Sequence, residues 1–372
     1  MRVVPTARAV RFDLRWALER DMTRGWHNAP GAGRQFTSPE YSHDVSYNAE
    51  SYRGALVPHA RTPGVHRVVM LGDSFTDGFS VPLEARVSAR LDARLAAAGL
   101  PTDTVALGTS GYGTDQEMLW LRDAGWDYRP DVVVVMFYQN DVWEVGERRP
   151  DGAPKPTFHL EGGRLAEQPL TPSELVPAPR PKGVEAWLDS HSQAYALAKA
   201  TMKNSPRLRA LGERLGLLYP VDPMWALHAG VQGDLQVFAR HPAATIDDRW
   251  RLVGALLAAM RDDCAAHGVP LVVFHVPARI AVEHDEWTRA SRTLGLPEAE
   301  WDPAEVDRRL ASLCDEHGLR CVEPHDAFVR AAASTALYYR IDAHWNAAGH
   351  DLAAAVLAER LRALWAAATG AS

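Results

Sequence analysis

The sequence has 372 residues, enough for one large domain or two ordinary ones, and its 47% hydrophobic content allows a full core. The formal net charge of −7 offers no basic excess that could neutralise phosphates, which argues against a general nucleic-acid-binding protein. The composition is that of a globular protein.

The first 66 residues are predicted to form an N-terminal helix and an extended arm that packs on the main domain. Residues 1–24 alternate apolar side chains with arginines and lack the continuous apolar run of a signal peptide or membrane span. We therefore expect an amphipathic helix there, packed on its own protein rather than on a membrane surface. Residues 25–66 are rich in turn-forming residues, and 45–48 is the one convincing strand among them.

From Arg67 onward, the pattern alternates between apolar strands and helices. Strands are predicted at 67–71, 103–107 and 131–137, with helices at about 83–98 and 114–124 between them. Residues 131–137 are apolar on both faces, which marks a central strand covered by helices on each side. The pattern predicts a three-layer α/β/α doubly wound parallel sheet of the flavodoxin-like kind.

The alternation is interrupted over residues 146–244, and a long helix is expected within the interruption at 184–218. An interruption of this length is usually a substrate-facing insertion or cap. Regular alternation then resumes, with a helix at 245–267, a strand at 270–276, a helix at 303–317, a strand at 320–322 and a helix at 347–367. We expect one domain over 67–372 that carries the insertion.

The last helix has apolar residues at helical spacing and should pack on the sheet. These residues are Leu352, Val356, Leu357, Leu361 and Leu364.

Four segments at predicted strand ends or before the last helix carry chemically useful side chains. They are Gly72-Asp73-Ser74, the glycine-rich 108–114, Gln139-Asn140-Asp141 and Asp342-Ala343-His344. Carboxyl ends of parallel strands share one edge of a sheet, where α/β proteins place their chemistry. Together the segments supply a nucleophile, an imidazole base, a carboxylate and oxyanion donors, the set that acyl transfer to serine needs. Singly, each has a structural interpretation as a helix cap or turn former.

These four blocks resemble the SGNH hydrolase superfamily, also called GDSL esterases, in a bacterial branch of undefined substrate. The resemblance implies Ser74 as nucleophile and His344 as base, oriented by Asp342. It also implies an oxyanion hole formed by Ser74, Gly111 and Asn140. The sequence departs from the usual motifs in having Phe75 for leucine, Tyr138-Gln139 before Asn140, and a shortened Asp-x-His.

The expected function is a serine esterase that hydrolyses a carboxylic ester through an acyl-enzyme. By analogy with relatives, the substrate would be a small-molecule or carbohydrate ester such as an O-acetyl group. Two alternatives stay open: an O-acyltransferase that uses the same serine, and a binding protein that keeps the fold without turnover. Four nearby aromatic residues are candidates to line the pocket or to pack in the core: Tyr112, Tyr138, Trp143 and Trp345.

No cofactor and no metal site are expected, because Asp342, His344 and His350 have no further ligands converging on them. The three cysteines cannot all pair and lack Cys-x-x-Cys spacing. We expect Cys314 and Cys321 to be a free buried pair. That cysteine usage favours a reducing compartment and hence the cytoplasm. The oligomeric state stays open.

Overall fold

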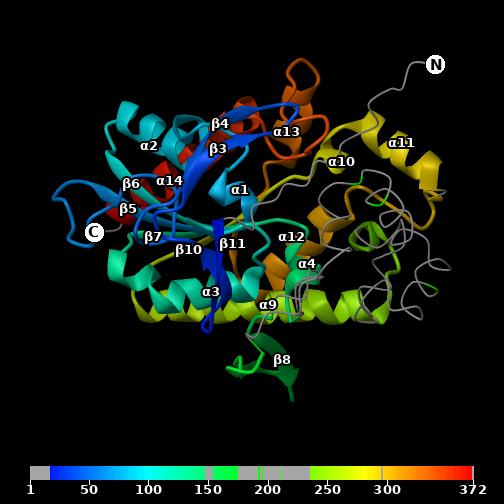
Figure 1. Ribbon diagram of the computed structural model, residues 1–372, viewed down its shortest axis with the longest axis horizontal. Coiled ribbons are helices and arrows are strands. Elements are labelled where there is room, and N and C mark those ends of the chain that lie inside the picture. The colour runs from blue at the N-terminus through cyan, green and yellow to red at the C-terminus, as the bar shows by residue number, and fades with distance from the viewer. Residues whose placement is uncertain are drawn as a thin grey trace.

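The structure, a computed structural model, describes residues 17–146, 154–174, 235–294 and 296–370, with the isolated residues 192, 195 and 211. Figure 1 shows its central feature, a sheet that lies between two layers of helices. The helix predicted over 184–218 and most of the insertion predicted over 146–244 fall outside the described residues, as do residues 1–16.

The central sheet has five strands in the order β11-β10-β7-β5-β6, and all its neighbours are parallel. The strands are β5 (His66–Gly72), β6 (Thr102–Gly108), β7 (Val132–Phe137), β10 (Leu271–His275) and β11 (Arg320–Val322). Every residue of β7 is buried, as expected for an apolar strand in the middle of a covered sheet. The predicted doubly wound α/β/α architecture is confirmed.

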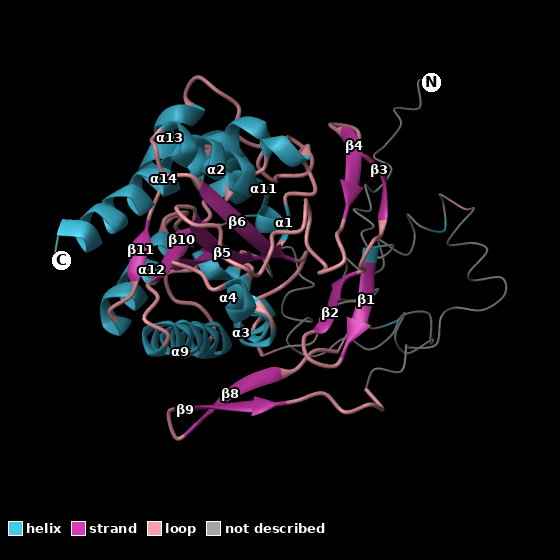
Figure 2. Cartoon of the chain, turned by 90° about the vertical axis from the view of Figure 1, so that its left-hand side faces the viewer, coloured by secondary structure: helices cyan, strands magenta, loops and turns pink. Residues whose placement is uncertain are grey.

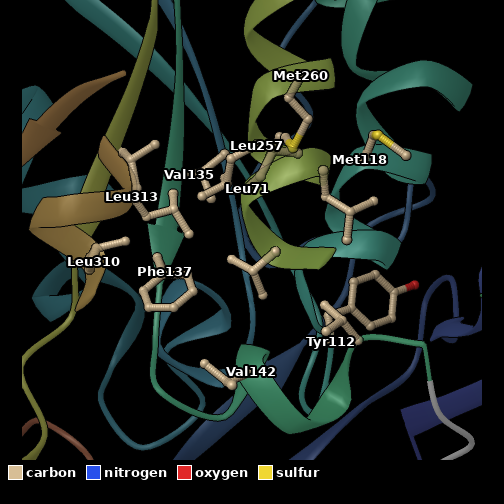
Figure 3. Close-up of a cluster of buried hydrophobic side chains, with 14 of the residues drawn as sticks. Leu71, Tyr112, Met118, Val135, Phe137, Val142, Leu257, Met260, Leu310 and Leu313 are labelled. Atoms are coloured by element: carbon tan, nitrogen blue, oxygen red, sulfur yellow. The ribbon is translucent and has the colours of Figure 1, made fainter. Parts of the chain in front are cut away.

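Helices cover both faces of the sheet (Figure 1). The first face packs against α2 (Val87–Ala97) and α14 (Ala347–Gly370). The second packs against α3 (Thr114–Asp123), α9 (Ala244–Ala266) and α12 (Glu305–His317). Figure 3 shows this second core, in which apolar residues of β5 and β7 meet those of α9.

The apolar stripe predicted for the last helix faces the sheet. Leu357 and Leu361 of α14 are fully buried, while Leu352, Val356 and Leu364 are partly buried against the same cluster. Full burial of one such side chain stabilises the fold by about 1.5–3 kcal/mol. This helix therefore anchors the segment that precedes it, which contains His344.

The helix predicted over 83–98 is divided into η2 (Leu83–Ala85) and α2. Arg86 separates them because its backbone is extended, with φ −67° and ψ 154°. The Arg86 guanidinium is buried and donates to the backbone carbonyl of Arg53 at 3.0 Å. Its role in holding the N-terminal arm explains why the helix does not run through it.

The described part of the N-terminal arm consists of two hairpins, which stand beside the sheet in Figure 2. They pair β1 (Leu18–Asp21) with β2 (Gly25–Asn28), and β3 (Gly33–Thr37) with β4 (Ser42–Ser46). The helix predicted over 1–24 is wrong at 18–21, where β1 pairs with β2. The Asp21 carboxylate accepts the Thr23 N–H at 2.8 Å and so closes the turn. An apolar cluster joins the arm to the main domain, and it includes Phe36 and Tyr41 of the arm and Phe79, which follows α1.

The described part of the insertion contains a hairpin that the sequence analysis did not predict. Its strands are β8 (Thr157–Glu161) and β9 (Arg164–Gln168). The remaining elements are α1 (Ser74–Asp77), η3 (Gly125–Tyr128), α4 (Asp141–Glu144), η4 (Gln236–Phe238), α10 (Arg279–Val282), α11 (His284–Leu294) and α13 (His325–Ala332). No helix in the described ranges has the length and apolar character needed to cross a bilayer.

Cys314 and Cys321 form a disulfide, with their Cα atoms 6.2 Å apart. The prediction of a free pair is wrong for a geometric reason. Gly318 ends α12 with a left-handed backbone, φ 61°, and β11 begins two residues later. The chain reverses at once and brings the strand back beside the last turn of the helix. Cys264 is a free, buried cysteine.

Candidate active site

Three of the four sequence blocks meet because the strands that precede them are neighbours. Gly72 at the end of β5 pairs with Gly108 of β6 on one side and with Met136 of β7 on the other. The turns that follow these strands therefore lie side by side at the carboxyl edge of the sheet.

Gly72 and Gly108 permit α1 to sit directly on this edge. A Cβ atom on Gly72 would lie 2.1 Å from Thr76 Oγ1, and one on Gly108 would lie 2.3 Å from the backbone nitrogen of Asp77. Any side chain at either position would displace α1. The two glycines thus fix the place of Ser74, the first residue of α1, which is partly exposed.

The fourth block joins the others through hydrogen bonds of His344. His344 Nε2 lies 2.8 Å from Ser74 Oγ, and His344 Nδ1 lies 2.5 Å from Asp342 Oδ1. Ala343, between the two, has φ +64°, a left-handed backbone that is unusual for a residue with a Cβ. This conformation lets residues two apart in sequence contact each other. The Asp342 side chain is 1% exposed and that of His344 is 21% exposed.

The surroundings of His344 favour its protonated form. Burial opposes the charge on the ring, but the hydrogen bond to Asp342 and the negative charges of Asp342 and Asp73 outweigh it and raise the pKa of His344. An imidazole with a raised pKa is a stronger base toward a neighbouring hydroxyl.

Asp73 ties the turn after β5 to the turn after β7. Its carboxylate accepts the backbone N–H of Phe75 at 2.9 Å and the side-chain amide of Asn140 at 3.1 Å. Ser74 Oγ lies 3.4 Å from the same carboxylate. Burial raises the pKa of Asp73. Asp73 thereby orients Asn140, whose amide nitrogen carries a second hydrogen that this bond does not use.

The backbone N–H groups of Ser74 and Gly111 have no hydrogen-bond acceptor among the described residues. Gly111 has a left-handed backbone, φ 76°, in the turn after β6. These two N–H groups and the amide of Asn140 remain the candidates for the predicted oxyanion hole.

Two of the four aromatic residues predicted to line a pocket are buried in the core. Tyr112 and Trp345 are each 0% exposed, so that part of the prediction is corrected. Tyr112 donates its hydroxyl to the Trp26 carbonyl. Tyr138 and Trp143 are partly exposed, and the Tyr138 ring lies 4.6 Å from that of Phe75, beside Ser74.

His350 stands apart from this site. It is buried, its Nδ1 accepts the Val87 N–H at 3.3 Å, and burial lowers its pKa to about 3, so the ring is neutral. Across the described ranges, no group of three or more His, Cys, Asp or Glu side chains has a geometry that could hold a metal ion.

A cavity of about 640 Å³ lies between α9 and the β8 strand, lined by residues that include Phe158, Thr245 and Arg249. None of the predicted site residues lines it. We therefore place the candidate active site at the sheet edge, where the polar groups converge.

Two residues of the arm contact the loop that carries Asp342 and His344, and the sequence analysis did not single them out. The Tyr41 hydroxyl donates to Asp342 Oδ2, and the Glu40 carboxylate accepts backbone N–H groups of the loop, including that of Asp342 at 3.0 Å. About 300 residues separate the partners in sequence, and no motif links them. Only the folded arrangement reveals these contacts.

Comparisons with family models agree with the resemblance seen in the sequence. A model of the GDSL-like lipase/acylhydrolase family matches residues 70–296, more than half of the chain, and includes Ser74, Gly111 and Asn140. A model of the SGNH hydrolase-like domain of the acetyltransferase AlgX matches residues 236–372, which include Asp342 and His344. A search among curated proteins found no match.

The solved structures that resemble this chain share little sequence with it. The acetyl xylan esterase AlAXEase is 12% identical, with a TM-score of 0.40 over 78% of this chain and 97% of its own. A lipase/acylhydrolase from Enterococcus faecalis is 12% identical, with a TM-score of 0.40 over 80% and 96%. An acetyl xylan esterase from Geobacillus stearothermophilus is 13% identical, with a TM-score of 0.38 over 78% and 92%. The family assignment rests on the sequence models alone.

Proposed function

Since the chain belongs to the GDSL-like lipase/acylhydrolase family, we propose that it is a serine esterase that forms an acyl-enzyme on Ser74. One observation carries the proposal: His344 bridges Ser74 Oγ, at 2.8 Å, and Asp342 Oδ1, at 2.5 Å. A hydroxyl, an imidazole and a carboxylate in this order are the arrangement that activates a serine nucleophile.

In the acylation step, Ser74 Oγ attacks the ester carbonyl carbon while its proton moves to His344 Nε2. Asp342 accepts the Nδ1–H bond, holds the ring in that tautomer and stabilises the imidazolium that forms. The tetrahedral intermediate then collapses. The bond to the alcohol oxygen breaks, and that oxygen takes the proton from His344.

In the deacylation step, water attacks the acyl-enzyme and gives its proton to His344. The carboxylic acid leaves, the proton returns to Ser74 Oγ, and the enzyme is regenerated. The negative oxygen of each intermediate would be met by the backbone N–H groups of Ser74 and Gly111 and by the Asn140 amide. Loss of one such donor typically lowers turnover by about 10²–10³-fold.

For the acyl group we propose acetyl, carried on a carbohydrate or another small hydroxylated molecule. The match of the C-terminal segment to a domain of an acetyltransferase supports an acetyl donor. Partly exposed Tyr138, whose ring lies 4.6 Å from that of Phe75, offers aromatic surface beside Ser74 on which a sugar ring can stack.

The experiment that tests the serine is hydrolysis of p-nitrophenyl acetate by wild type and by Ser74→Ala. We expect the variant to lose at least about 10³-fold in kcat, because the nucleophile itself is removed. A fluorophosphonate probe should label the wild type and fail to label the variant. Full activity in Ser74→Ala would reject the proposal. Labelling of the wild type argues against the alternative of a binding protein without turnover.

The second candidate is an O-acyltransferase, which the acetyltransferase AlgX match specifically favours. It would use the same acyl-enzyme but pass the acyl group to an acceptor hydroxyl instead of water. Product analysis with an acetyl donor and an oligosaccharide acceptor separates the two. Acetylated acceptor in excess of free acetate indicates transfer, and free acetate alone indicates hydrolysis.

A further inference from the structure

We infer that Glu40 and Tyr41 of the N-terminal arm are positioning residues that hold the His344–Asp342 pair in its reactive geometry. The inference rests on the proposed function, in which that pair is the base. It assigns the arm a part in the reaction, although the arm precedes the family match, which begins at residue 70.

Glu40 holds the backbone of the loop that carries the pair. Its carboxylate accepts three successive backbone N–H groups, those of Arg340 at 2.7 Å, Ile341 at 2.9 Å and Asp342 at 3.0 Å. Successive N–H groups that point to one side form an anion-binding concavity. Here the arm fills it with a carboxylate, and such charge-assisted bonds are about twice as strong as neutral ones.

Tyr41 holds the side chain of Asp342. Its hydroxyl donates to Asp342 Oδ2, which leaves Oδ1 to accept from His344. Burial and the contact with Asp342 raise the pKa of Tyr41, so the hydroxyl keeps its proton and stays a donor. The Tyr41 ring is 9% exposed and packs at 4.8 Å from the ring of Tyr339, which fixes its direction.

The loop needs support from outside because it is short and its backbone is unusual. It is closed by hydrogen bonds between Tyr339 N–H and the His344 carbonyl at 2.9 Å and between Ala343 N–H and the Tyr339 carbonyl at 3.2 Å. Ala343 is left-handed, and the Ile341 side chain is 60% exposed, so the tip gains little from burial. Arg279 of α10 binds loop carbonyls, including that of Tyr339 at 3.1 Å. Glu40 thus binds N–H groups of this loop, and Arg279 binds its carbonyl groups.

The Tyr41 bond also affects the electrostatics of the base. The charged groups that face His344 are Asp342 in its own loop and Asp73 at the start of α1, while buried His350 of α14 is neutral. The Tyr41 hydroxyl compensates part of the Asp342 charge. Without it, more of that charge acts on His344, so the pKa of His344 should rise further.

The first test is Tyr41→Phe, with Tyr128→Phe as the matched control. Both tyrosines donate a hydroxyl to a carboxylate, Asp342 and Glu50 respectively, but Tyr128 precedes β7 and so lies at the opposite edge of the sheet. We expect Tyr41→Phe to lower kcat about three- to tenfold with KM unchanged, the loss of one orienting hydrogen bond. The acidic limb of the pH profile of kcat/KM should move to higher pH in Tyr41→Phe. Tyr128→Phe should change neither. Equal effects of the two substitutions, or no effect of Tyr41→Phe, would overturn the inference.

The second test is Glu40→Ala beside Glu40→Gln, with Glu50→Ala as the control carboxylate in the arm. Glu40→Ala removes all three acceptor bonds and should lower kcat by more than tenfold with little change in KM. Glu40→Gln keeps one acceptor oxygen and should recover part of that loss. Identical loss in Glu40→Ala and Glu50→Ala would point to general destabilisation of the arm and contradict positioning.

Titration of His344 by nuclear magnetic resonance separates this inference from the proposed function, because it needs no turnover. The pKa of His344 should be higher in Tyr41→Phe than in wild type and unchanged in Tyr128→Phe. If Ser74→Ala keeps full activity, the proposed function fails while this shift is still measured. An unchanged His344 pKa in Tyr41→Phe rejects the inference and leaves the proposed function unaffected.

Discussion

His344 is the residue on which the proposed chemistry depends, because it is the only group that contacts both Ser74 and Asp342 in the described part of the chain. This arrangement requires a strained, left-handed backbone at Ala343, the residue between Asp342 and His344. Asp73 complements it on the other side of Ser74 by orienting Asn140. The site is therefore assembled by short contacts from three separate turns.

The raised pKa of His344 predicts the acid side of the pH profile. Burial lowers the pKa of His344, but the contact with Asp342 raises it by more. The ring must be neutral to accept the Ser74 proton. We expect kcat/KM for an uncharged acetate ester to fall on acidification with a midpoint above pH 6.5, the ordinary histidine value. A pH series in buffers of constant ionic strength measures this. A midpoint at or below 6.5 would contradict the assignment of His344 as the base in this environment.

At the residue scale, the sequence predicted which polar residues come together better than it predicted their surroundings. Ser74, His344, Asp342 and Asn140 lie in short blocks whose residue types are themselves the signal. Tyr112 and Trp345 show the limit of such reasoning. An aromatic residue next to a motif is equally able to face a pocket or the core, and only the packing of the neighbouring helices decides which.

At the scale of elements, α2 is joined to β6 by a partly buried carboxylate. Asp92 accepts the Thr104 hydroxyl at 2.5 Å and the Thr104 N–H at 3.2 Å. Burial nevertheless raises the pKa of Asp92 to about 7, with the Thr104 bonds opposing the shift. Between about pH 4 and pH 7 the folded protein binds a proton there that the unfolded chain has released. The contribution of Asp92 to stability therefore decreases as pH rises through this window.

Asp92→Asn tests this pH dependence. Asparagine can accept the Thr104 N–H and donate to the Thr104 hydroxyl, so both contacts survive without a partly buried charge. The free energy of unfolding of the variant relative to wild type should increase by about 4 kcal/mol between pH 4 and pH 8. Denaturant titrations at the two values measure it. A difference that does not change with pH would show that Asp92 ionises normally in the folded protein.

Long apolar elements were predictable from sequence, and short polar ones were not. The strands β5, β6, β7 and β10 and the helix α14 carry apolar runs or stripes that leave little choice of structure. Hairpin β8–β9 is short and polar, yet its turn, Gly162-Gly163, has positive φ at both residues. Two adjacent glycines between strand-length segments are a sequence signal of a hairpin. The arm hairpins β1–β2 and β3–β4 have no such glycine pair in their turns.

At the scale of the whole molecule, the arm and the sheet domain are joined by packing and by hydrogen bonds at the candidate site. The arm packs apolar side chains against Phe79, which follows α1, and its Tyr41 reaches Asp342 near the far end of the chain. The sequence divides at about residue 66 by composition, but the candidate site crosses that boundary. The domain division at 66 and 67 and the cap role of 146–244 stay predictions.

The prediction of a reducing compartment rested on cysteines that were expected to be unpaired. The disulfide between Cys314 and Cys321 removes that support, so the cytoplasmic location stays a prediction without it. The bond closes a short loop, with a sequence separation of seven, between α12 and β11. In the chain-entropy model, closure of such a loop stabilises the fold by about 2.5 kcal/mol. Mild reductant should therefore lower the free energy of unfolding of wild type by about that amount. It should leave a Cys314→Ser, Cys321→Ser double variant unchanged, since that variant has no bond to reduce.

Thiol alkylation of protein taken directly from cells would report the same bond in vivo. Three reactive thiols after unfolding would show that it is reduced there, and one, from Cys264, would show that the protein folds in an oxidising compartment.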